Sequence, residues 1–310
     1  MHKNNSNGLA FEDNAFIREK ATNIFFNMTI GEVILLFNKE LKGIYPDNEI
    51  NSIIEYLFSH YTGLSRFQIF SERNKILSED VKKYLSEVLP LLLNHKPVQY
   101  ITGFTEFYNC RLQVTPDVLI PRPETEELVK WIIDDEQTSP LRILDIGTGS
   151  GNIAIALAKN ITGSVVDACD ISEPSLTVAG NNAVLNNAWV NLFHLDILKW
   201  QEEKTDITWD IIVSNPPYVC ISEIKTMLPN VHMYEPHIAL FVPDDNPLIF
   251  YKSVADFSGL HLAGGGSLYF EINENHAVET INLLNHHGFE NVTLKTDING
   301  KNRMLKANKK

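Results

Sequence analysis

The feature that most constrains the fold is the regular alternation of short apolar runs with helical segments after Arg142. Runs such as 142–146, 164–170 and 210–214 have the length and composition of buried strands, and helix-like segments separate them. Strands joined by crossover helices pair in parallel and are covered by helices on both faces. This part of the chain is therefore predicted to be an α/β domain with a Rossmann-like sheet.

The region before this domain has a different periodicity. Apolar residues recur at helical spacing between Thr29 and about Lys96, which predicts a small all-α domain. Short extended pieces with turn residues follow, and these indicate a β-hairpin linker. We expect a helical domain at residues 1–104 with about the first 15 residues flexible, the linker at 105–123, and the α/β domain at 124–310.

Charge counts against nucleic acid as the main partner. The 310 residues include 39 acidic and 26 basic side chains, which gives a formal charge of −13. Residues 1–105 carry 12 acidic and 11 basic side chains, so the remaining 27 acidic and 15 basic side chains place −12 in the α/β domain. Such an acidic surface provides no favourable long-range field for a polyanion, and no direct contact with nucleic acid is expected.

Cysteine usage and hydropathy predict the compartment. Cys110, Cys169 and Cys220 lie far apart, so neither a zinc ribbon nor a disulfide framework is encoded, and reduced thiols fit best. The N-terminal stretch lacks the pattern of a signal peptide, and no run of about 18 apolar residues occurs. We expect a cytoplasmic protein that has no membrane partner and is a monomer.

A glycine-rich loop follows the predicted strand 142–146. Gly147, Thr148, Gly149, Ser150 and Gly151 stand between this strand and a predicted helix. Glycines let the backbone turn tightly and approach a ligand, while the helix N-terminus supplies unpaired N–H groups. The loop is therefore predicted to bind a ligand.

The identity of this ligand stays open on the loop alone. Read from Gly149, the loop satisfies the dinucleotide fingerprint, and Asp170 stands about 20 residues on, where an acid holds ribose hydroxyls. A nicotinamide-dependent dehydrogenase is one interpretation. Asp145, followed by three alternating glycines, instead resembles motif I of the class I S-adenosylmethionine methyltransferases. Both classes use an acid such as Asp170, so that residue does not discriminate.

The decisive motif is Asn215-Pro216-Pro217-Tyr218, which follows the apolar strand 210–214. Ligands of open α/β sheets bind outside the carboxyl ends of the strands, so this loop and the glycine loop are expected to share one crevice. The side-chain oxygen of Asn215 and the carbonyl of Pro216 can accept both N–H bonds of a planar NH2 group. The prolines fix the backbone, and Tyr218 is predicted to lie against the flat face of the substrate. The motif thus favours methyl transfer to an NH2 nitrogen that is conjugated with a carbonyl group or an aromatic ring, through positioning rather than a strong base.

The sequence resembles a known family at several places beyond this motif. Asn-Pro-Pro-Tyr after the fourth strand is the signature of methyltransferases that act on adenine N6, guanine N2 or glutamine N5. Residues 97–103, Glu106-Phe107, 119–126 and 234–236 resemble the glutamine branch, the PrmC/HemK-type methyltransferases of peptide-chain release factors. The resemblance spans roughly residues 30 to 307. It implies a seven-stranded class I methyltransferase domain preceded by a small helical domain.

The resemblance also implies a substrate, a cofactor and residue roles. Members use S-adenosylmethionine to methylate the glutamine N5 of the Gly-Gly-Gln motif in release factors, which modulates translation termination and yields S-adenosylhomocysteine. The helical domain contacts the protein substrate. By position, Gly147, Thr148, Gly149, Ser150 and Gly151 hold the methionine part and Asp170 the ribose. Asn215, Pro216, Pro217 and Tyr218 hold the glutamine, with Asn215 also beside the cofactor.

Further residues receive weaker assignments. Ile197 is expected to give apolar packing near the adenine, and Phe107 and Arg122 are expected to line the substrate site through the linker. Asn182 matches a recurrent family asparagine, but a role on the helix surface is an equal alternative. His232, Glu235 and His237 lack the spacing of a metal site, so no metal is predicted, and Glu235 is interpreted as a loop anchor that covers the site.

Two other functions stay open. A nucleic-acid methyltransferase acting on adenine N6 or guanine N2 shares residues 215–218, but a basic groove and a base-recognition insert are not visible. A non-catalytic cofactor-binding or assembly protein with a relic site is the second alternative. The intact motifs count against it.

Overall fold

The structure is a computed structural model that describes residue 25 and residues 27–135, 140–202 and 206–310. It consists of two compact units, with the division between Thr102 and Gly103. The flexible start that the sequence predicts, at about residues 1–15, lies outside the described residues.

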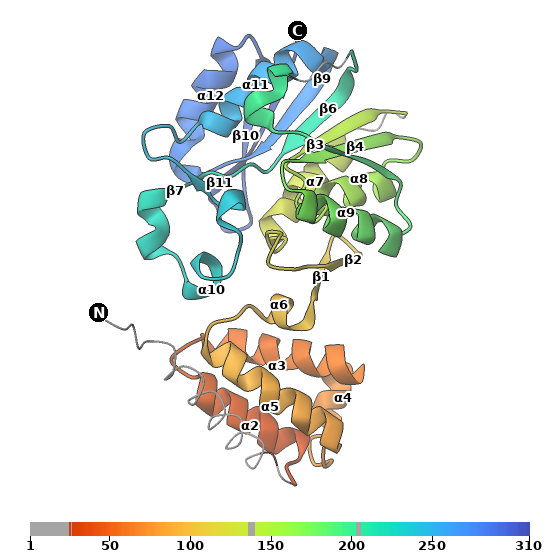
Figure 1. Ribbon diagram of the computed structural model, residues 1–310, viewed down its shortest axis with the longest axis vertical. Coiled ribbons are helices and arrows are strands. Elements are labelled where there is room, and N and C mark those ends of the chain that lie inside the picture. Colours follow the sequence, from red (N-terminus) through yellow and green to blue (C-terminus); the bar gives the residue numbers. More distant parts are fainter. Residues whose placement is uncertain (1–24, 26, 136–139, 203–205) are drawn as a thin grey trace, which may run out of the picture. The chain divides into compact units, whose positions relative to one another are not determined.

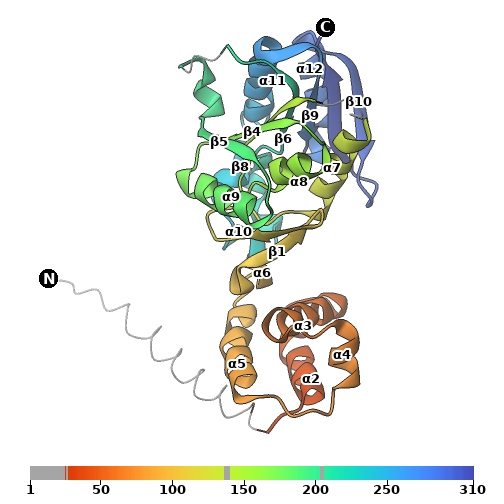
Figure 2. The ribbon, with the colours of Figure 1, turned by 90° about the vertical axis from the view of Figure 1, so that its right-hand side faces the viewer.

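The first unit is a helical bundle, as the apolar spacing predicts. Its helices are α2 (Ile30–Leu41), α3 (Asp47–Thr62), α4 (Arg66–Ser71), α5 (Glu79–Leu93) and α6 (Val98–Thr102). Helix α2 begins with a capping box, in which the Thr29 hydroxyl accepts from the Glu32 backbone N–H and Glu32 accepts from the Thr29 backbone. Apolar faces of these helices bury a core that includes Phe37, Leu57 and Leu92. Figure 2 shows α2 to α5 packed together.

The second unit begins with the hairpin that the sequence predicts. Strands β1 (Phe104–Phe107) and β2 (Cys110–Gln113) pair antiparallel through a two-residue turn. Tyr108 and Asn109 in the turn both have positive φ, which suits the twist of a short hairpin. The inward-facing side chains of the hairpin join the core beneath the sheet, so the hairpin is packed as part of this unit.

A seven-stranded sheet forms the centre of the second unit, in the order β10-β11-β9-β6-β3-β4-β5. Five strands run parallel: β3 (Arg142–Ile146), β4 (Val165–Asp170), β5 (Val190–His194), β6 (Trp209–Ser214) and β9 (Leu262–Glu271). Strand β11 (Asn302–Asn308) pairs antiparallel with both β9 and β10 (Glu290–Thr296). The predicted α/β fold is confirmed, and the last two strands, β10 and β11, form an antiparallel hairpin at one edge of the sheet.

Helices cover both faces of this sheet (Figure 1). One face packs on α7 (Pro123–Asp135), α8 (Asn152–Asn160) and α9 (Glu173–Leu185), and the other on α11 (Ile249–His261) and α12 (Ala277–His286). Side chains of a strand alternate between these layers. On β3, for example, Ile143 belongs to the first core and Leu144 to the second. The carboxyl end of β3, from which the glycine loop begins, is therefore held between two hydrophobic layers.

The chain reverses its direction across the sheet between β3 and β6. From β3 the strands proceed to β4 and β5 on one side, and from β6 they proceed to β9 on the other. The loops that follow β3 and β6 therefore diverge to opposite faces and leave a crevice at the carboxyl ends, where ligands of open α/β sheets bind.

Among the described residues, no helix has the length and apolar character needed to cross a membrane.

The remaining segments close the unit around this crevice. They are η1 (Ile197–Glu202), β7 (Val219–Cys220), η2 (Ile221–Thr226), α10 (Pro229–His232), η3 (His237–Ala239), β8 (Phe241–Val242) and η4 (Glu274–His276). Strands β7 and β8 pair in parallel. This small sheet brings the chain after residue 240 back beside the Asn-Pro-Pro-Tyr segment.

Candidate active site

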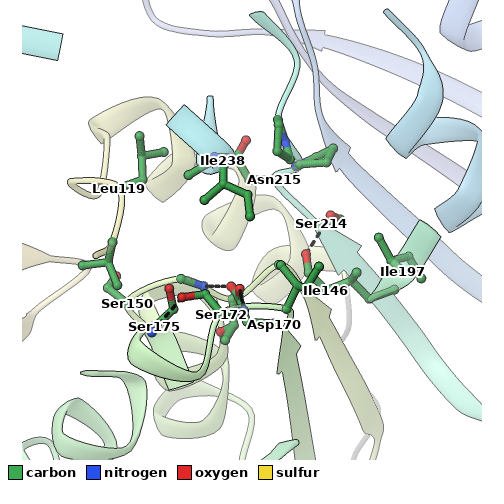
Figure 3. A pocket seen from close by; sticks show the side chains of 18 of the residues that line it. Leu119, Ile146, Ser150, Asp170, Ser172, Ser175, Ile197, Ser214, Asn215 and Ile238 are labelled. Carbon is green, nitrogen blue, oxygen red and sulfur yellow. Dashed lines mark hydrogen bonds between the residues drawn. The ribbon is translucent and has the colours of Figure 1, made fainter. Parts of the chain in front are cut away.

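A cavity of about 250 Å³ lies at the carboxyl ends of β3, β4 and β6. Figure 3 shows Asp170 and Ser172 on one side of it and Asn215 and Ile238 on the opposite side. We call residues 147–150 with Asp170 the glycine wall, and residues 214–217 the asparagine wall. The crevice that the two sequence motifs were predicted to share is present in the structure.

The glycine wall depends on backbone conformations that other residues rarely adopt. Gly147 and Gly149 have φ values of +75° and +54°, and a Cβ at either position would meet no atom within 4 Å. Gly151, with φ +81°, differs because its Cβ would lie 3.2 Å from the Ala179 Cβ and 3.0 Å from Ile155. The first two glycines therefore give the loop its shape beside the cavity. Gly151 lies behind the cavity and permits α8 and α9 to approach closely.

Asp145 holds the glycine loop from within the protein. Its side chain is fully buried, and Oδ2 accepts hydrogen bonds from the Thr148 hydroxyl at 2.7 Å and from the Ala154 N–H at 3.2 Å. The other oxygen, Oδ1, has no hydrogen-bond partner. Burial raises the pKa of Asp145 to about 7 although both hydrogen bonds oppose the shift. The carboxyl group thus fixes the loop rather than contacting a ligand.

Asp170 lies at the end of β4 and faces the cavity. Its Oδ2 accepts from the Gly149 N–H at 2.8 Å and its Oδ1 from the Ser172 N–H at 2.9 Å. Burial raises the pKa of Asp170, and these backbone hydrogen bonds oppose the rise. The carboxylate is therefore held in place by the glycine wall and keeps lone pairs for ligand hydroxyls.

Asn182 is not a helix-surface residue, which was one of its two predicted roles. Its side chain is fully buried, and its oxygen accepts from the Gln113 N–H at 2.6 Å. Its NH2 group donates to the carbonyls of Gln113 and Ser150, each at 2.9 Å. The residue therefore connects α9, the hairpin and the glycine loop. Both amide hydrogens and the amide oxygen are used within the protein, whereas a surface asparagine would leave them to water.

The asparagine wall brings three of the four motif residues to the cavity. Asn215, Pro216 and Pro217 line it, and the preceding Ser214 donates a hydrogen bond of 2.7 Å to the Ile146 carbonyl at the end of β3. This bond joins the starts of the two loops. The two walls are thus held in register at the switch point of the sheet.

Tyr218 does not line the cavity, so the structure does not support the predicted stacking on substrate. Its hydroxyl donates to Glu271 Oε1 at 3.1 Å, and its carbonyl accepts from the Asn273 side chain at 3.0 Å. Burial and the neighbouring Glu271 carboxylate raise its pKa. The tyrosine instead anchors the end of the motif to β9, because its ring packs against the second core.

Sequence reasoning missed a buried hydrogen-bonded group behind the asparagine wall. The Thr125 hydroxyl donates to Glu271 Oε2 at 2.6 Å, and the Asn215 NH2 group donates to the Thr125 oxygen at 3.4 Å. Glu271 is 2% exposed and ends strand β9. An acidic residue at the end of an apolar strand is the same signal that singles out Asp145 and Asp170, and it could have identified Glu271.

Arg122 and Glu235 form the ion pair that anchors the loop after residue 228. The Arg122 guanidinium donates to Glu235 Oε1, and the Ile120 N–H donates to Glu235 Oε2 at 3.2 Å. Arg122 lines the cavity, and its predicted contact with substrate stays a prediction. These bonds confirm the interpretation of Glu235 as a loop anchor. In the same loop, the His237 ring contacts the His232 carbonyl at 2.9 Å.

Phe107 lies elsewhere than predicted. It is 1% exposed and packs in the core beneath the sheet, and it is not part of the cavity lining. Residues of β1 alternate between the two faces of the hairpin, and Phe107 stands on the inward face with Thr105. The hairpin therefore supplies packing at this position, while Asp117, Leu119 and Pro121 beyond it reach the cavity.

The residues that line the cavity fit S-adenosylmethionine in their chemistry. The Ser150 hydroxyl is buried without a partner, the Asp170 carboxylate faces the cavity, and no Cβ occupies the space beside Gly147 and Gly149. Apolar side chains supply the remaining wall: Ile146, Ile171, Ile197, Phe250 and Val254. Polar groups for the ionic part, an acid for the ribose and an apolar slot for a flat ring are thus present together.

Comparisons of the sequence with known families give two matches. Residues 32–103 match the PrmC N-terminal domain, and residues 125–231 match the methyltransferase small domain. A release factor glutamine methyltransferase from Flavobacterium psychrophilum is 43% identical over 88% of this chain and 96% of its own length. A protein of the same name from Bacteroides thetaiotaomicron is 39% identical over 90% of this chain and all of its own length.

Solved structures share the fold of the second unit. The catalytic domain of human Mettl16 has a TM-score of 0.52 and 16% identity, and the alignment covers 69% of this chain and 82% of that one. A 16S rRNA methyltransferase from Thermus thermophilus, RsmC, has a TM-score of 0.50 and 18% identity over 67% of this chain and 50% of that one. At these identities the likeness shows the fold alone.

Proposed function

The chain belongs to the family of release factor glutamine methyltransferases, and we propose that it methylates the glutamine N5 of the Gly-Gly-Gln motif in peptide-chain release factors. The enzyme uses S-adenosylmethionine, and the reaction modulates translation termination. The observation that carries the proposal is the single cavity shared by the glycine wall and Asn215-Pro216-Pro217. The first motif suits the cofactor and the second suits a planar amide.

The glycine wall and its neighbours hold the cofactor in this proposal. The N–H groups of Gly147, Thr148 and Gly149 already donate within the protein. The methionine part therefore lies against residues 147–150 with the Ser150 hydroxyl as its polar contact, and the Asp170 carboxylate accepts from the ribose hydroxyls. Ile197 packs beside the adenine. When bound, S-adenosylmethionine supplies a methyl group on a positively charged sulfur, and S-adenosylhomocysteine is the product.

The asparagine wall orients the substrate amide. An amide nitrogen is a poor nucleophile because its lone pair is delocalised into the carbonyl group. The Asn215 side-chain oxygen and the Pro216 carbonyl accept the two N–H bonds and thereby favour a nitrogen with a localised lone pair. Pro216 and Pro217 fix φ, which keeps these acceptors in place before the substrate binds. Arg122 lines the same cavity, and its ion pair with Glu235 holds its guanidinium group in place.

The domain roles and partners are also part of the proposal. Residues 1–104 form the substrate-recognition domain, residues 105–123 the linker and residues 124–310 the catalytic domain. The partner is a release factor, and the enzyme acts as a cytoplasmic monomer without direct contact to nucleic acid. The match of residues 32–103 to the PrmC N-terminal domain supports a separate role for the helical unit.

The test is a methyl-transfer assay with labelled S-adenosylmethionine. Wild-type protein should label a purified release factor on the Gly-Gly-Gln peptide, located by mass spectrometry, and should not label RNA or DNA. A release factor whose motif glutamine is replaced by alanine should stay unlabelled. Label confined to nucleic acid would overturn the proposal.

The Asn215→Ala variant tests the acceptor loop within the same assay. Losing the acceptor should lower kcat by about 100-fold or more, because transition-state hydrogen bonds of this kind contribute that much. Asn160→Ala is the matched control, because Asn160 is an exposed residue at the end of α8 whose side chain donates to the Ala156 carbonyl of its own helix. The control should methylate the release factor at the wild-type rate.

A further inference from the structure

Four polar side chains form a chain of hydrogen bonds that begins at Asn215 in the asparagine wall and continues into the protein. Asn215 donates to Thr125, Thr125 donates to Glu271 Oε2, and Tyr218 donates to Glu271 Oε1. The four residues come from helix α7, the loop after β6 and the end of β9. Thr125 is 1% exposed and Glu271 is 2% exposed, so water does not compete for these groups.

The number of hydrogens in this chain determines which way the Asn215 amide faces. A threonine hydroxyl has one hydrogen, and Thr125 gives it to Glu271, an acceptor on both oxygens when ionised. The Thr125 oxygen can then only accept, so only the NH2 group of Asn215 can face it. The Asn215 oxygen consequently faces away from Thr125 and remains available to accept a hydrogen bond.

Arg303 on the neighbouring strand β11 stabilises the ionised form of Glu271. Burial raises the pKa of Glu271, whereas the bonds from Thr125 and Tyr218 and the nearby Arg303 guanidinium lower it. Arg303 is itself fixed, because it donates to Asp297 at 3.1 Å and to the Ile272 carbonyl at 3.4 Å. Glu271 thus has two hydrogen-bond donors and one cation around it, which is the environment that a buried carboxylate requires.

We propose that Thr125 and Glu271 are positioning residues that hold the Asn215 side-chain oxygen toward the amide nitrogen that is methylated. The inference rests on the proposed function, because it assigns these residues to the same reaction. Thr125 lines the cavity and Glu271 does not, and the proposal assigns both residues to the orientation of Asn215 rather than to contact with the reacting atoms. Their effect passes through the orientation of Asn215, whose amide would otherwise be free to present either its oxygen or its NH2 group to the substrate.

The Glu271→Gln variant should change which groups donate and which accept in this chain of hydrogen bonds. The Tyr218 hydroxyl keeps the glutamine oxygen at the Oε1 position, so the glutamine NH2 group takes the Oε2 position and donates to the Thr125 oxygen. This bond releases the hydroxyl hydrogen of Thr125 to bond with the Asn215 oxygen. Asn215 would then present its NH2 group to the substrate amide, and two donors would face each other. The substitution keeps the size of the side chain, so the proposal predicts lower kcat in a folded protein.

The experiment compares Thr125→Val, Thr125→Ser and Glu271→Gln in the release factor assay. Thr125→Val removes the hydroxyl at nearly constant size and should lower kcat about 10- to 100-fold, the scale of a misplaced catalytic group. Thr125→Ser keeps the hydroxyl and should restore most of this loss. The affinity for S-adenosylhomocysteine, measured by calorimetry, and the KM for release factor should change less than about threefold, in keeping with an effect on orientation alone.

Thr280→Val is the matched control for the chemical change. Thr280 is a fully buried helix residue whose hydroxyl donates to the His276 carbonyl, and it does not line the cavity. Its valine variant should keep wild-type kcat. Circular dichroism of each variant verifies the fold, and Glu271→Gln tests the inference separately if Thr125→Val does not fold.

The possible outcomes separate the inference from the proposed function. If wild-type protein fails to methylate the release factor, the proposed function is wrong. If wild-type protein is active and Thr125→Val or Glu271→Gln keeps wild-type kcat, the inference alone is overturned. A loss of rate that Thr125→Ser does not restore would also overturn it, because packing rather than the hydroxyl would then be the cause. A loss restored by serine, at unchanged cofactor affinity, supports it.

Discussion

The two walls of the cavity are held by different kinds of contact. Two aspartates hold the glycine wall. The side chain of Asp145 behind it bonds to residues 3 and 9 positions away, and that of Asp170 within it bonds to residues 2 and 21 positions away. Behind the asparagine wall the bond between Thr125 and Glu271 spans 146 positions, and that between Asn215 and Thr125 spans 90. The glycine wall is thus built mainly from local contacts, and the asparagine wall depends on the completed sheet.

This difference predicts separate effects on cofactor binding and on methyl transfer. Substitutions in the glycine wall should change the affinity for cofactor or the stability of the loop. Substitutions behind the asparagine wall should change kcat, because they act on how the substrate amide is held. A variant that violates this division would show that the two walls act as one unit.

The largest expected effect concerns the buried carboxyl group of Asp145. Only one of its two oxygens accepts hydrogen bonds, whereas both oxygens of Glu271 do. Because burial raises its pKa to about 7, Asp145 stays protonated in the folded protein up to about that pH, whereas in the unfolded chain it ionises near its ordinary pKa of 3.8. Unfolding in this range releases a proton, so this contribution to stability is fully present at low pH and is lost as the pH rises to about 7. The maximum contribution is about 4 kcal/mol, because each tenfold change in an acid dissociation constant corresponds to about 1.4 kcal/mol.

The Asp145→Asn variant should remove this pH dependence. Urea unfolding of both proteins at several pH values between about 4 and 8 measures it. The free energy of unfolding of the wild type should fall relative to the variant as the pH rises. A constant difference between the two curves would mean that Asp145 is ionised throughout, and its loop would then resemble the donor-rich surroundings of Glu271.

The next largest effect is expected for Asp170→Ala in the glycine wall. Loss of a charged acceptor for the ribose hydroxyls should weaken S-adenosylhomocysteine binding by about 100-fold, since hydrogen bonds to charged groups contribute about 1.5 to 3 kcal/mol each. At saturating cofactor, kcat should stay within a few fold of wild type. Calorimetry and steady-state kinetics measure the two quantities, and Asp256→Asn on the outside of α11 is the control. A loss of kcat without a loss of affinity would contradict the division between the walls.

Two glycines of the loop allow a matched comparison within the same wall. Gly147→Ala and Gly151→Ala both place a side chain at positive φ, which costs about 1 to 2 kcal/mol. Only Gly151→Ala also forces a Cβ against Ala179, so it should lose about 1 kcal/mol more in the free energy of unfolding. Urea denaturation distinguishes them. Equal losses would show that α8 and α9 can separate without cost.

The sequence could predict the glycine wall because its contacts lie within one strand-loop-helix unit. Spacing alone identifies Gly147 and Asp170, and the structure places both at the cavity. The partners of Asn215 could not be found in this way. In the sequence Thr125 is part of a helix start and Glu271 is the end of a strand, and only the order of the strands in the sheet brings them together.

Partners that are distant in the sequence also explain the placement of Asn182 and Tyr218. The sequence leaves the role of Asn182 undecided because its partners, Gln113 and Ser150, lie 69 and 32 positions away. The motif assigns Tyr218 to substrate because it follows Asn-Pro-Pro, but strand β9 supplies Glu271 as a stronger partner for its hydroxyl. In both cases an element distant in the sequence supplies the hydrogen-bond partners that determine where the side chain lies.

The smallest expected effect is that of Phe107→Leu, and it tests the boundary between site and scaffold. The place of Phe107 in the sequence predicts a contact with substrate, but the structure buries it in the core of the hairpin. A volume-reducing apolar change there should cost about 1 kcal/mol in the free energy of unfolding. The KM for release factor and kcat should both stay at wild-type values, because the side chain does not line the cavity. An increase in KM at unchanged stability would instead place Phe107 on the substrate side and extend the asparagine wall to the hairpin.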